Sequence, residues 1–415
     1  MDIASNKVDT YKLDNGIRVV FEQNNHLNSV TIGVWIGVGS RDENKENNGI
    51  AHVIEHMLFK GTKKMTAEEL AIKTAILGGG LNAYTSKENT EYYCRTLPSC
   101  LKEAVDILGD MICNSLLDEE DLEKEKCVVC EEIDMYKDSP EDSVHEVLQK
   151  KIWRGQSIGY LISGKKKNVR TFTVLQLRAF MDKYYVGENM VVSVAGKFNK
   201  AEALSWIKEA FSDIKPSARK NDDRIKPVHN IAYFEKEKDI EQLHLNMAFP
   251  APSFMDDSRY TAVVLNNIFG GDVNSRLFQG IREKYGLTYS VYSYGSSFSD
   301  TGLFHVYAAM SRQQKDKVFE LVRDIINDLR KNGVTKSELE NAKKQTVVEM
   351  SLNRDSTSSL MSANAKSVIY GIPFIPFSEK IKCIESVSEE EVNKMITECL
   401  NLKKLSYGII GPINS

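Results

Sequence analysis

Two histidines and a glutamate one helical turn apart are the residues of this chain best suited to chemistry. His52, Glu55 and His56 lie in a stretch whose apolar residues recur at helical spacing, and Gly61 marks its expected end. Because positions three and four apart are neighbours on a helix, the three side chains are predicted to face the same way. Neutral imidazoles bind zinc, and a carboxylate that is not a ligand can act as a base toward water. The alternative is an amphipathic helix on which two histidines coincide by chance.

A second candidate feature is a long helix predicted from about residue 118 to 137, with acidic residues in its first turn, as the helix dipole favours. Glu125 and Glu132 lie seven residues apart on it, so two helical turns place both carboxylates on one side. The alternative for both is a solvated acidic face, the usual environment of glutamate on a helix.

Composition indicates a globular protein without a nucleic-acid or membrane partner. The 415 residues are 42% hydrophobic and 27% charged with a net charge of -4, and their number suggests two or three domains. No apolar run reaches the roughly 18 residues of a membrane span, and the start lacks a basic-then-apolar signal pattern. We therefore expect a cytoplasmic location. The seven cysteines are an odd, scattered set, so we expect reduced thiols, with Cys127 and Cys130 as ordinary helix residues rather than a metal pair.

The elements around these residues are predicted from turn and capping signals. Asn15-Gly16 between two apolar runs predicts a hairpin, and residues 29–40 read as a strand whose glycines indicate close packing against a neighbour. Thr66 to Glu69 is a capping box that opens a helix ending at the glycines 78–80. Residues 81–95 read as two strands with a turn near 87–89. The glycines are not followed by Gly-Lys-Ser/Thr, so they indicate a tight turn rather than a phosphate loop.

A long internal repeat indicates two domains of one kind. The capped helix and strand that begin at Thr173 recur 215 residues later at Ser388, while the long acidic helix recurs 217 residues later near Leu339. In the second copy the helix matching the first motif falls near residues 263–267 and has no histidine, although Glu349 is retained as a relic or structural acid. A polar segment bracketed by prolines between the copies is the best linker. We expect a domain at 1–213, a linker at 214–230 and a homologous domain without a metal site at 231–415.

With these residues in view, the chain resembles the pitrilysin/insulinase-type zinc peptidases, an inverzincin family, and specifically their processing-peptidase-like branch. The resemblance covers nearly the whole chain. It rests on His52-x-x-Glu55-His56 followed by Phe-Lys-Gly-Thr, and on further motifs at residues 80–85, 130–133, 184–196, 275–278 and 282–290. It implies an α+β fold of two homologous domains, each an antiparallel-rich mixed β-sheet covered by helices, forming half of a metallopeptidase clamshell.

The resemblance assigns a third zinc ligand to Glu132, completing a site for one Zn²⁺ per chain with His52 and His56. A zinc ion held by two histidines does need a third protein ligand if it is to leave a position for water. Glu131 points about 100° away around the helix, so Glu132 is preferred. Glu125 is then the candidate that orients a ligand histidine by hydrogen bonding.

The resemblance also assigns substrate-binding residues. It implies that the strand containing Asn82, Ala83 and Tyr84 offers an unpaired edge to which an extended peptide adds, although Asn82 alone would read as a turn residue. Arg282 and Tyr289 match the pair from the second domain that binds the scissile carbonyl oxygen, whereas alone they would read as a surface charge and a strand aromatic.

The function expected from these roles is zinc-dependent endopeptidase hydrolysis of extended peptides or unfolded segments inside a chamber, with Glu55 as base. The family's chamber has four domains, so a chain of this length must pair, as a homodimer or with a different partner chain. The alternative is a non-catalytic or partner-dependent subunit of a heterodimeric processing peptidase. Where relatives often show His-Pro-Leu-Gly, this chain has Gln156-Ser157-Ile158-Gly159, so no site role is assigned there. Cleavage preference and physiological substrate do not follow from the sequence.

Overall fold

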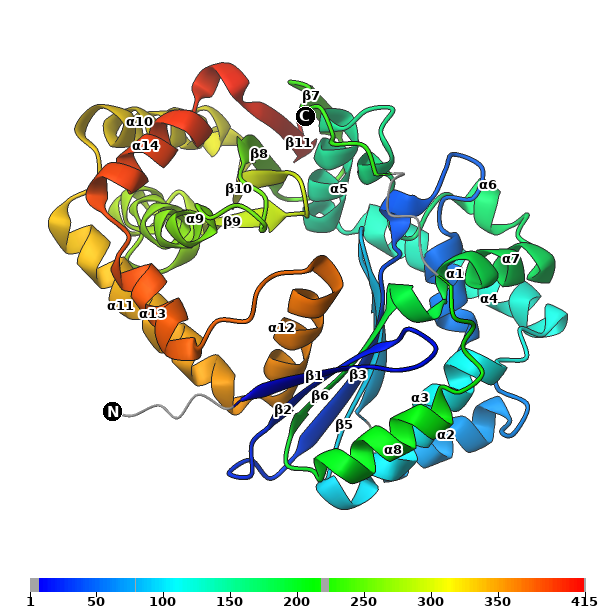
Figure 1. Ribbon diagram of the computed structural model, residues 1–415. Coiled ribbons are helices and arrows are strands. Elements are labelled where there is room, and N and C mark those ends of the chain that lie inside the picture. The colour runs from blue at the N-terminus through cyan, green and yellow to red at the C-terminus, as the bar shows by residue number, and fades with distance from the viewer. Residues whose placement is uncertain (1–6, 79, 218–223, 414–415) are drawn as a thin grey trace. The chain divides into compact units, whose positions relative to one another are not determined.

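The computed structural model describes residues 7–78, 80–217 and 224–413, which form two compact α+β units (Figure 1). Of these described residues, unit 1 contains those up to 134 and those within 160–225 and 351–375, and unit 2 contains those within 135–159 and 226–350 and those from 376 onward. The units thus differ from the expected halves 1–213 and 231–415 by two exchanged segments. Residues 135–159 belong with the second unit and residues 351–375 with the first. Part of the expected linker 214–230 lies outside the described residues.

Unit 1 is built on a six-stranded sheet in the order β1-β2-β6-β3-β5-β4. The strands are β1 (Val8–Lys12), β2 (Arg18–Gln23), β3 (Val30–Ile36), β4 (Leu81–Thr85), β5 (Thr90–Thr96) and β6 (Met190–Gly196). β2 and β6 are parallel and the other neighbours are antiparallel. The expected hairpin is confirmed as β1 and β2, and β4 is an edge strand.

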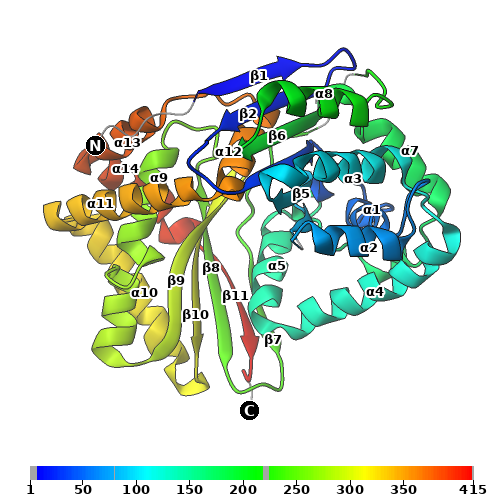
Figure 2. The same ribbon diagram turned by 90° about the horizontal axis from the view of Figure 1, so that it is seen from below.

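Helices cover both faces of this sheet. In chain order they are α1 (Ile50–Met57), α2 (Ala67–Ile76), α3 (Leu101–Asn114), α4 (Glu119–Asp138), α6 (Lys166–Val169), α7 (Val174–Tyr184), α8 (Lys200–Ala210) and α12 (Thr357–Tyr370). Apolar side chains of α1, α3, α7 and α8 form the main core with one sheet face. The other face is covered by α12 (Figure 2). Its residues Leu360, Met361 and Ala365 pack against strand residues that include Trp35. A helix from the second half of the chain therefore completes the first unit.

Glycines of unit 1 mark close approaches or tight turns, as the sequence predicts. A Cβ atom on Gly33 of β3 would lie 2.3 Å from Sδ of Met361 on α12. Gly78 has φ +99°, and a Cβ on Gly80 would lie 2.3 Å from the carbonyl oxygen of Arg95. Gly79 lies outside the described residues. The capping box of α2 is confirmed, because Thr66 and Glu69 exchange both side-chain-to-backbone hydrogen bonds.

Unit 2 repeats the topology of unit 1 with one strand fewer, in the order β7-β11-β8-β10-β9. Its strands are β7 (Tyr233–Glu237), β8 (Leu243–Ala251), β9 (Thr288–Ser297), β10 (Gly302–Met310) and β11 (Ser406–Gly411). β7 and β11 are parallel and the remaining pairs are antiparallel, which is the pattern of β2-β6-β3-β5-β4. The internal repeat inferred from the sequence is therefore confirmed by strand order and direction.

The helices of unit 2 are α5 (Pro140–Ile152), α9 (Arg259–Asn266), α10 (Lys315–Asn332), α11 (Lys336–Leu352), α13 (Phe377–Glu385) and α14 (Glu389–Cys399). Apolar residues of α9, α10 and α14 cover one sheet face, while Val144, Leu148 and Ile152 of α5 pack on the other. α5 thus occupies in unit 2 the role of α12 in unit 1. No helix in the described ranges is both long and apolar enough to cross a membrane.

Candidate metal centre

The structure brings His52, His56 and Glu132 together in unit 1. Each offers one ligand atom, and these atoms all lie within 4.8 Å of one another. Oε2 of Glu132 is 3.3 Å from Nε2 of His56 and 3.6 Å from Nε2 of His52. Donor atoms held at 2.0–2.1 Å around a tetrahedral ion lie about 3.4 Å apart, so the three side chains fit zinc. Among the described residues no other such group occurs, and the matching helix α9 has no histidine.

Local sequence explains how α1 presents its two histidines. Ile50, Val53, Ile54 and Met57 are buried in the core, which turns the opposite side of the helix toward α4. The N-cap residue before the helix is Gly49, whose φ of +106° favours glycine. Glu43 caps it from outside, because its carboxylate accepts hydrogen bonds from the backbone N–H groups of Gly49 and Ala51, at 2.8 and 2.9 Å. Burial raises the pKa of Glu43 to about 8.

Glu125 on α4 contacts the ring nitrogen of His56 that does not face Glu132. One of its carboxylate oxygens lies 3.0 Å from Nδ1 of His56, and the other lies 2.7 Å from Nζ of Lys60. A hydrogen bond at Nδ1 leaves Nε2 of His56 to face Glu132. Burial opposes protonation of His56, but hydrogen bonds with Glu125 and Glu132 raise its pKa to about 9. The pKa of His52 is lowered to about 4, first by burial and then by the neighbouring His56.

Glu55 lies beside the three donors without joining them. Its carboxylate accepts a hydrogen bond from Oγ1 of Thr85, the last residue of β4. Burial raises its pKa, while the Thr85 hydrogen bond acts in the opposite direction. A non-ligating carboxylate with a raised pKa, next to a candidate metal centre, has the chemistry of a general base.

Three of the predicted substrate-binding residues lie on the edge strand β4. Asn82 and Tyr84 are exposed and Ala83 is half-buried between them. Tyr84 pairs across the sheet with Glu91 of β5, which in turn pairs with Trp35 of β3.

The other two predicted substrate-binding residues lie in unit 2. There the guanidinium carbon of Arg282 lies 4.5 Å from the ring centre of Tyr289, and Tyr289 is 77% exposed.

Sequence reasoning missed four residues near the centre: Glu43, Lys60, Thr85 and Glu91. No local pattern indicates the first three, because each acts on a residue brought near by packing. Glu91 has a buried carboxylate oxygen without a hydrogen-bond partner among the described residues, and burial followed by the charge of Glu55 raises its pKa to about 7. Its position opposite Tyr84 is set by strand register, which the sequence alone did not specify.

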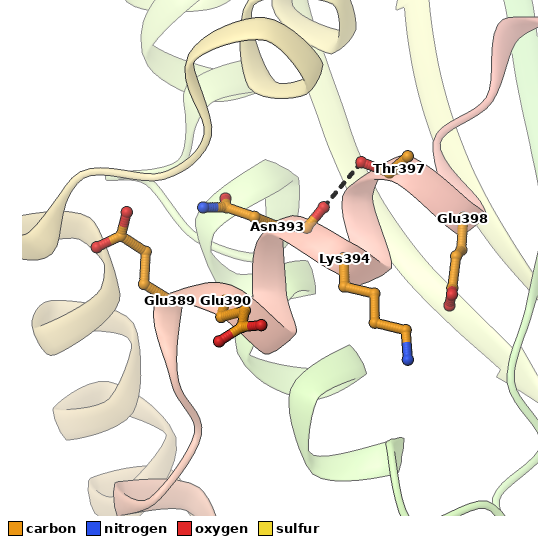
Figure 3. Close-up of a pocket in the computed structure, with 6 residues that line it drawn as sticks. All are labelled: Glu389, Glu390, Asn393, Lys394, Thr397 and Glu398. Carbon is orange, nitrogen blue, oxygen red and sulfur yellow. Dashed lines mark hydrogen bonds between the residues drawn. The ribbon is translucent and has the colours of Figure 1, made fainter.

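A hollow on the surface of unit 2 is not a candidate functional site. Figure 3 shows this hollow, whose lining residues all belong to α14: Glu389, Glu390, Asn393, Lys394, Thr397 and Glu398. The hydroxyl of Thr397 donates to the carbonyl oxygen of Asn393 within the same helix. A face of one helix with side chains of both charges is an ordinary solvated surface.

The seven cysteines are free thiols, and Cys130 is buried in the core.

A His-His-Glu donor set with a separate, non-ligating glutamate is typical of zinc metallopeptidases. Comparison with known proteins agrees with that class. Residues 18–166 match the model of the insulinase family, peptidase family M16, and residues 171–346 match the model described as the peptidase M16 inactive domain. The chain belongs to this family.

Relatives and solved structures similar to the chain extend over nearly its whole length. It is 39% identical to the uncharacterized zinc protease YmxG of Bacillus subtilis, covering 98% of each chain. It is 33% identical to an uncharacterized zinc protease of Streptomyces coelicolor, covering 97% of this chain and 89% of that one. A crystal structure of a peptidase M16 inactive domain from Pseudomonas fluorescens has a TM-score of 0.90 at 21% identity, with 98% of both chains covered, which shows the shared fold.

Proposed function

We propose that the protein is a zinc-dependent endopeptidase that hydrolyses extended peptides or unfolded segments. The observation that carries this proposal is the placement of the non-ligating Glu55 beside His52, His56 and Glu132, with its hydrogen-bond donor Thr85 on the edge strand β4. One Zn²⁺ per chain would be held by the two histidines and Glu132. When bound, zinc acts as a Lewis acid and lowers the pKa of water at the site.

The chain's own residues would supply the proton transfers. The carboxylate of Glu55 accepts a proton from the attacking water and later delivers it to the leaving amine. Thr85 fixes the direction of that carboxylate through its hydroxyl. Glu125 accepts a hydrogen bond from the Nδ1–H group of His56, so that the lone pair of Nε2 is left to bind the metal.

Peptide binding is proposed at β4. Its outer edge has no neighbouring strand in the described sheet, so an extended peptide can add there through main-chain hydrogen bonds. Such binding makes little demand on substrate sequence. Asn82, Ala83 and Tyr84 would form the strand that the peptide joins, and the exposed side chains of Asn82 and Tyr84 would contact it.

Arg282 and Tyr289 are proposed to bind the scissile carbonyl oxygen and the charge that develops on it. What supports this is their resemblance to the family pair, their mutual contact and the exposure of the Tyr289 phenol. Because one chain carries both this pair and the metal donors, a homodimer could be self-sufficient, and we propose that state over a heterodimer. Light scattering of the purified chain distinguishes the two.

The alternative function is a non-catalytic or partner-dependent subunit of a heterodimeric processing peptidase. The observation that favours it is the match of residues 171–346 to a model described as an inactive domain. Digestion of a mixed peptide library by the purified chain separates the readings. The proposal predicts cleavage that a chelator stops and zinc restores. Intact peptides with a zinc-loaded chain alone, and cleavage only after a second chain is added, would support the alternative.

A further inference from the structure

Arg224 lies in the segment expected to be a solvated linker, yet its side chain is only 16% exposed. Its Nε and Nη2 atoms donate to the two carboxylate oxygens of Asp42 at 2.8 and 2.7 Å. Nη2 also donates to the carbonyl oxygen of Glu88 at 2.8 Å. The next residue, Ile225, accepts a hydrogen bond from Arg41 through its carbonyl oxygen at 3.0 Å. The linker thus docks within unit 1 instead of only connecting two halves of the chain.

The docking site is formed by a loop and a turn that bind each other, namely the loop at residues 37–43 and the β4–β5 turn at residues 86–89. The backbone N–H groups of Ser40 and Arg41 donate to the carbonyl oxygens of Ser86 and Lys87 at 3.1 and 2.8 Å. The guanidinium of Arg41 donates to the carboxylate of Glu88 at 2.6 Å, with both side chains almost fully buried. Arg224 spans the loop and the turn, since Asp42 belongs to one and Glu88 to the other.

The turn and the loop of this docking site each adjoin a residue that contacts the helix of the metal centre, namely Thr85 and Glu43. The turn begins one residue after Thr85, which donates to the carboxylate of Glu55, and β4 is the proposed peptide edge. The loop ends at Glu43, whose carboxylate caps the helix that carries His52 and His56. A displacement of the turn relative to the loop would therefore separate the base from the strand that binds the peptide.

The cluster contains buried charges of both signs, with Arg41 and Arg224 facing Asp42 and Glu88, and Lys366 also interacting with Glu88. Buried ion pairs of this kind add little net stability, because the cost of removing charges from water offsets their attraction. What they can supply is a fixed arrangement of the groups that carry them. Asp42 also accepts from the backbone N–H of Gly39 at 2.9 Å, and a Cβ on Gly39 would lie 2.3 Å from the carbonyl oxygen of Ser86. The loop and the turn therefore fit in one close arrangement.

We propose that Arg224 is a positioning residue for peptide hydrolysis, which holds the β4–β5 turn against the loop at residues 37–43 and so sets Thr85 and β4 relative to α1. This inference rests on the proposed function, because it explains how the peptide edge and the base are kept together. The part of the chain that connects the two halves is then also part of what orders the active site.

Replacement of Arg224 by Lys tests the proposal. Lys keeps the charge but lacks the planar guanidinium whose Nε and Nη2 atoms contact Asp42 and the main chain of Glu88. Arg18→Lys is the matched control. Arg18 is also in unit 1 and donates to the carbonyl oxygens of Val368 and Glu188, at 2.8 and 3.2 Å, with no contact to the turn. Both variants are compared for zinc content, thermal midpoint, peptide hydrolysis, and backbone hydrogen exchange of residues 81–96.

For Arg224→Lys we expect exchange at residues 81–96 to be at least tenfold faster, with kcat/KM for an extended peptide at least tenfold lower, while Arg18→Lys changes neither. Zinc content and the exchange of α1 should stay as in the unaltered protein, which a general loss of folding would not allow. Equal exchange at residues 81–96 in all three proteins, or equal activity loss in the two variants, would overturn the inference. If the unaltered protein cleaves nothing, the proposed function fails, while faster exchange confined to Arg224→Lys still supports the positioning of the turn.

Discussion

The Nδ1 atom of His56 lies 3.0 Å from a carboxylate oxygen of Glu125, although the two residues are 69 positions apart on α1 and α4. This contact leaves Nε2 of His56 facing Glu132. Removing the charge of Glu125 should therefore weaken metal binding even though Glu125 is not itself a donor. The contact thus gives a test of the centre that does not depend on catalysis.

Glu125→Gln is predicted to lower zinc affinity by about 10- to 100-fold, the usual effect of losing a group that orients a ligand histidine. Competition against a chromophoric zinc chelator measures it. Glu120→Gln is the control, because Glu120 is exposed on the first turn of the same helix. Equal affinity in Glu125→Gln and the unaltered protein would show that the contact does not influence the metal.

Glu132→Gln and Glu131→Gln provide a matched pair for the third donor. Glu132 faces both histidines, whereas Glu131 is exposed on the next position around α4. We expect the first variant to be isolated with little zinc and the second with about one ion per chain. Metal analysis by mass spectrometry after dialysis gives the result. A zinc-free Glu131→Gln together with a loaded Glu132→Gln would reverse the assignment.

Tyr289→Phe is predicted to lower kcat by about 100-fold, the typical effect of removing one donor to a developing oxyanion. Tyr289 is 77% exposed in unit 2, so loss of its hydroxyl should leave the unfolding midpoint unchanged. Steady-state kinetics with one extended peptide, combined with metal analysis, check both points. An unaltered kcat in the zinc-loaded variant would remove Tyr289 from the proposed site.

Stability of unit 2 should fall in mild acid because of two histidines, the buried His305 on β10 and the half-buried His145 on α5. His305 is fully buried, donates a hydrogen bond from Nδ1 to the amide oxygen of Asn246 and stacks on Tyr294. Burial lowers its pKa to about 3, followed by the effect of His145, whose own pKa burial lowers to about 4. An unfolded histidine titrates near 6.5, so the neutral forms stabilise the fold fully above that pH and lose this contribution as the pH falls.

Between pH 6.5 and 5, His305 alone should reduce the free energy of unfolding by about 2 kcal/mol. Urea denaturation at several pH values measures this dependence. His305→Phe keeps an aromatic ring against Tyr294 but cannot titrate, so its stability should decline less steeply with acid. The same slope in both proteins would show that His305 is not responsible.

Local patterns predicted most elements because their causes are local. The capping residues Thr66 and Thr173 begin α2 and α7, and the repeat of Thr173 at Ser388 begins α14 with the same capping box. The absence of histidine near residues 263–267 likewise follows directly from the sequence. Strand order in unit 2 then agrees with the expected repeat, because homologous segments share their pairing partners.

Long-range contacts could not be predicted in the same way. The exchange of α5 and α12 between the units depends on which sheet face each helix covers, and that is decided by contacts with strands far away in the sequence. Arg224 lies in a segment whose composition is typical of a solvated linker, yet Asp42 and Glu88 bury its guanidinium. Glu43 caps α1 from seven residues before its start, beyond the reach of any capping motif.

Glu55→Gln tests the proposed role of Glu55 as the base. The variant should retain about one zinc per chain, because His52, His56 and Glu132 are unchanged. Its hydrolysis of a mixed peptide library should fall by at least about 1,000-fold, since an amide cannot accept the proton from water. A zinc-loaded Glu55→Gln protein that cleaves peptides at the unaltered rate would exclude Glu55 as the base.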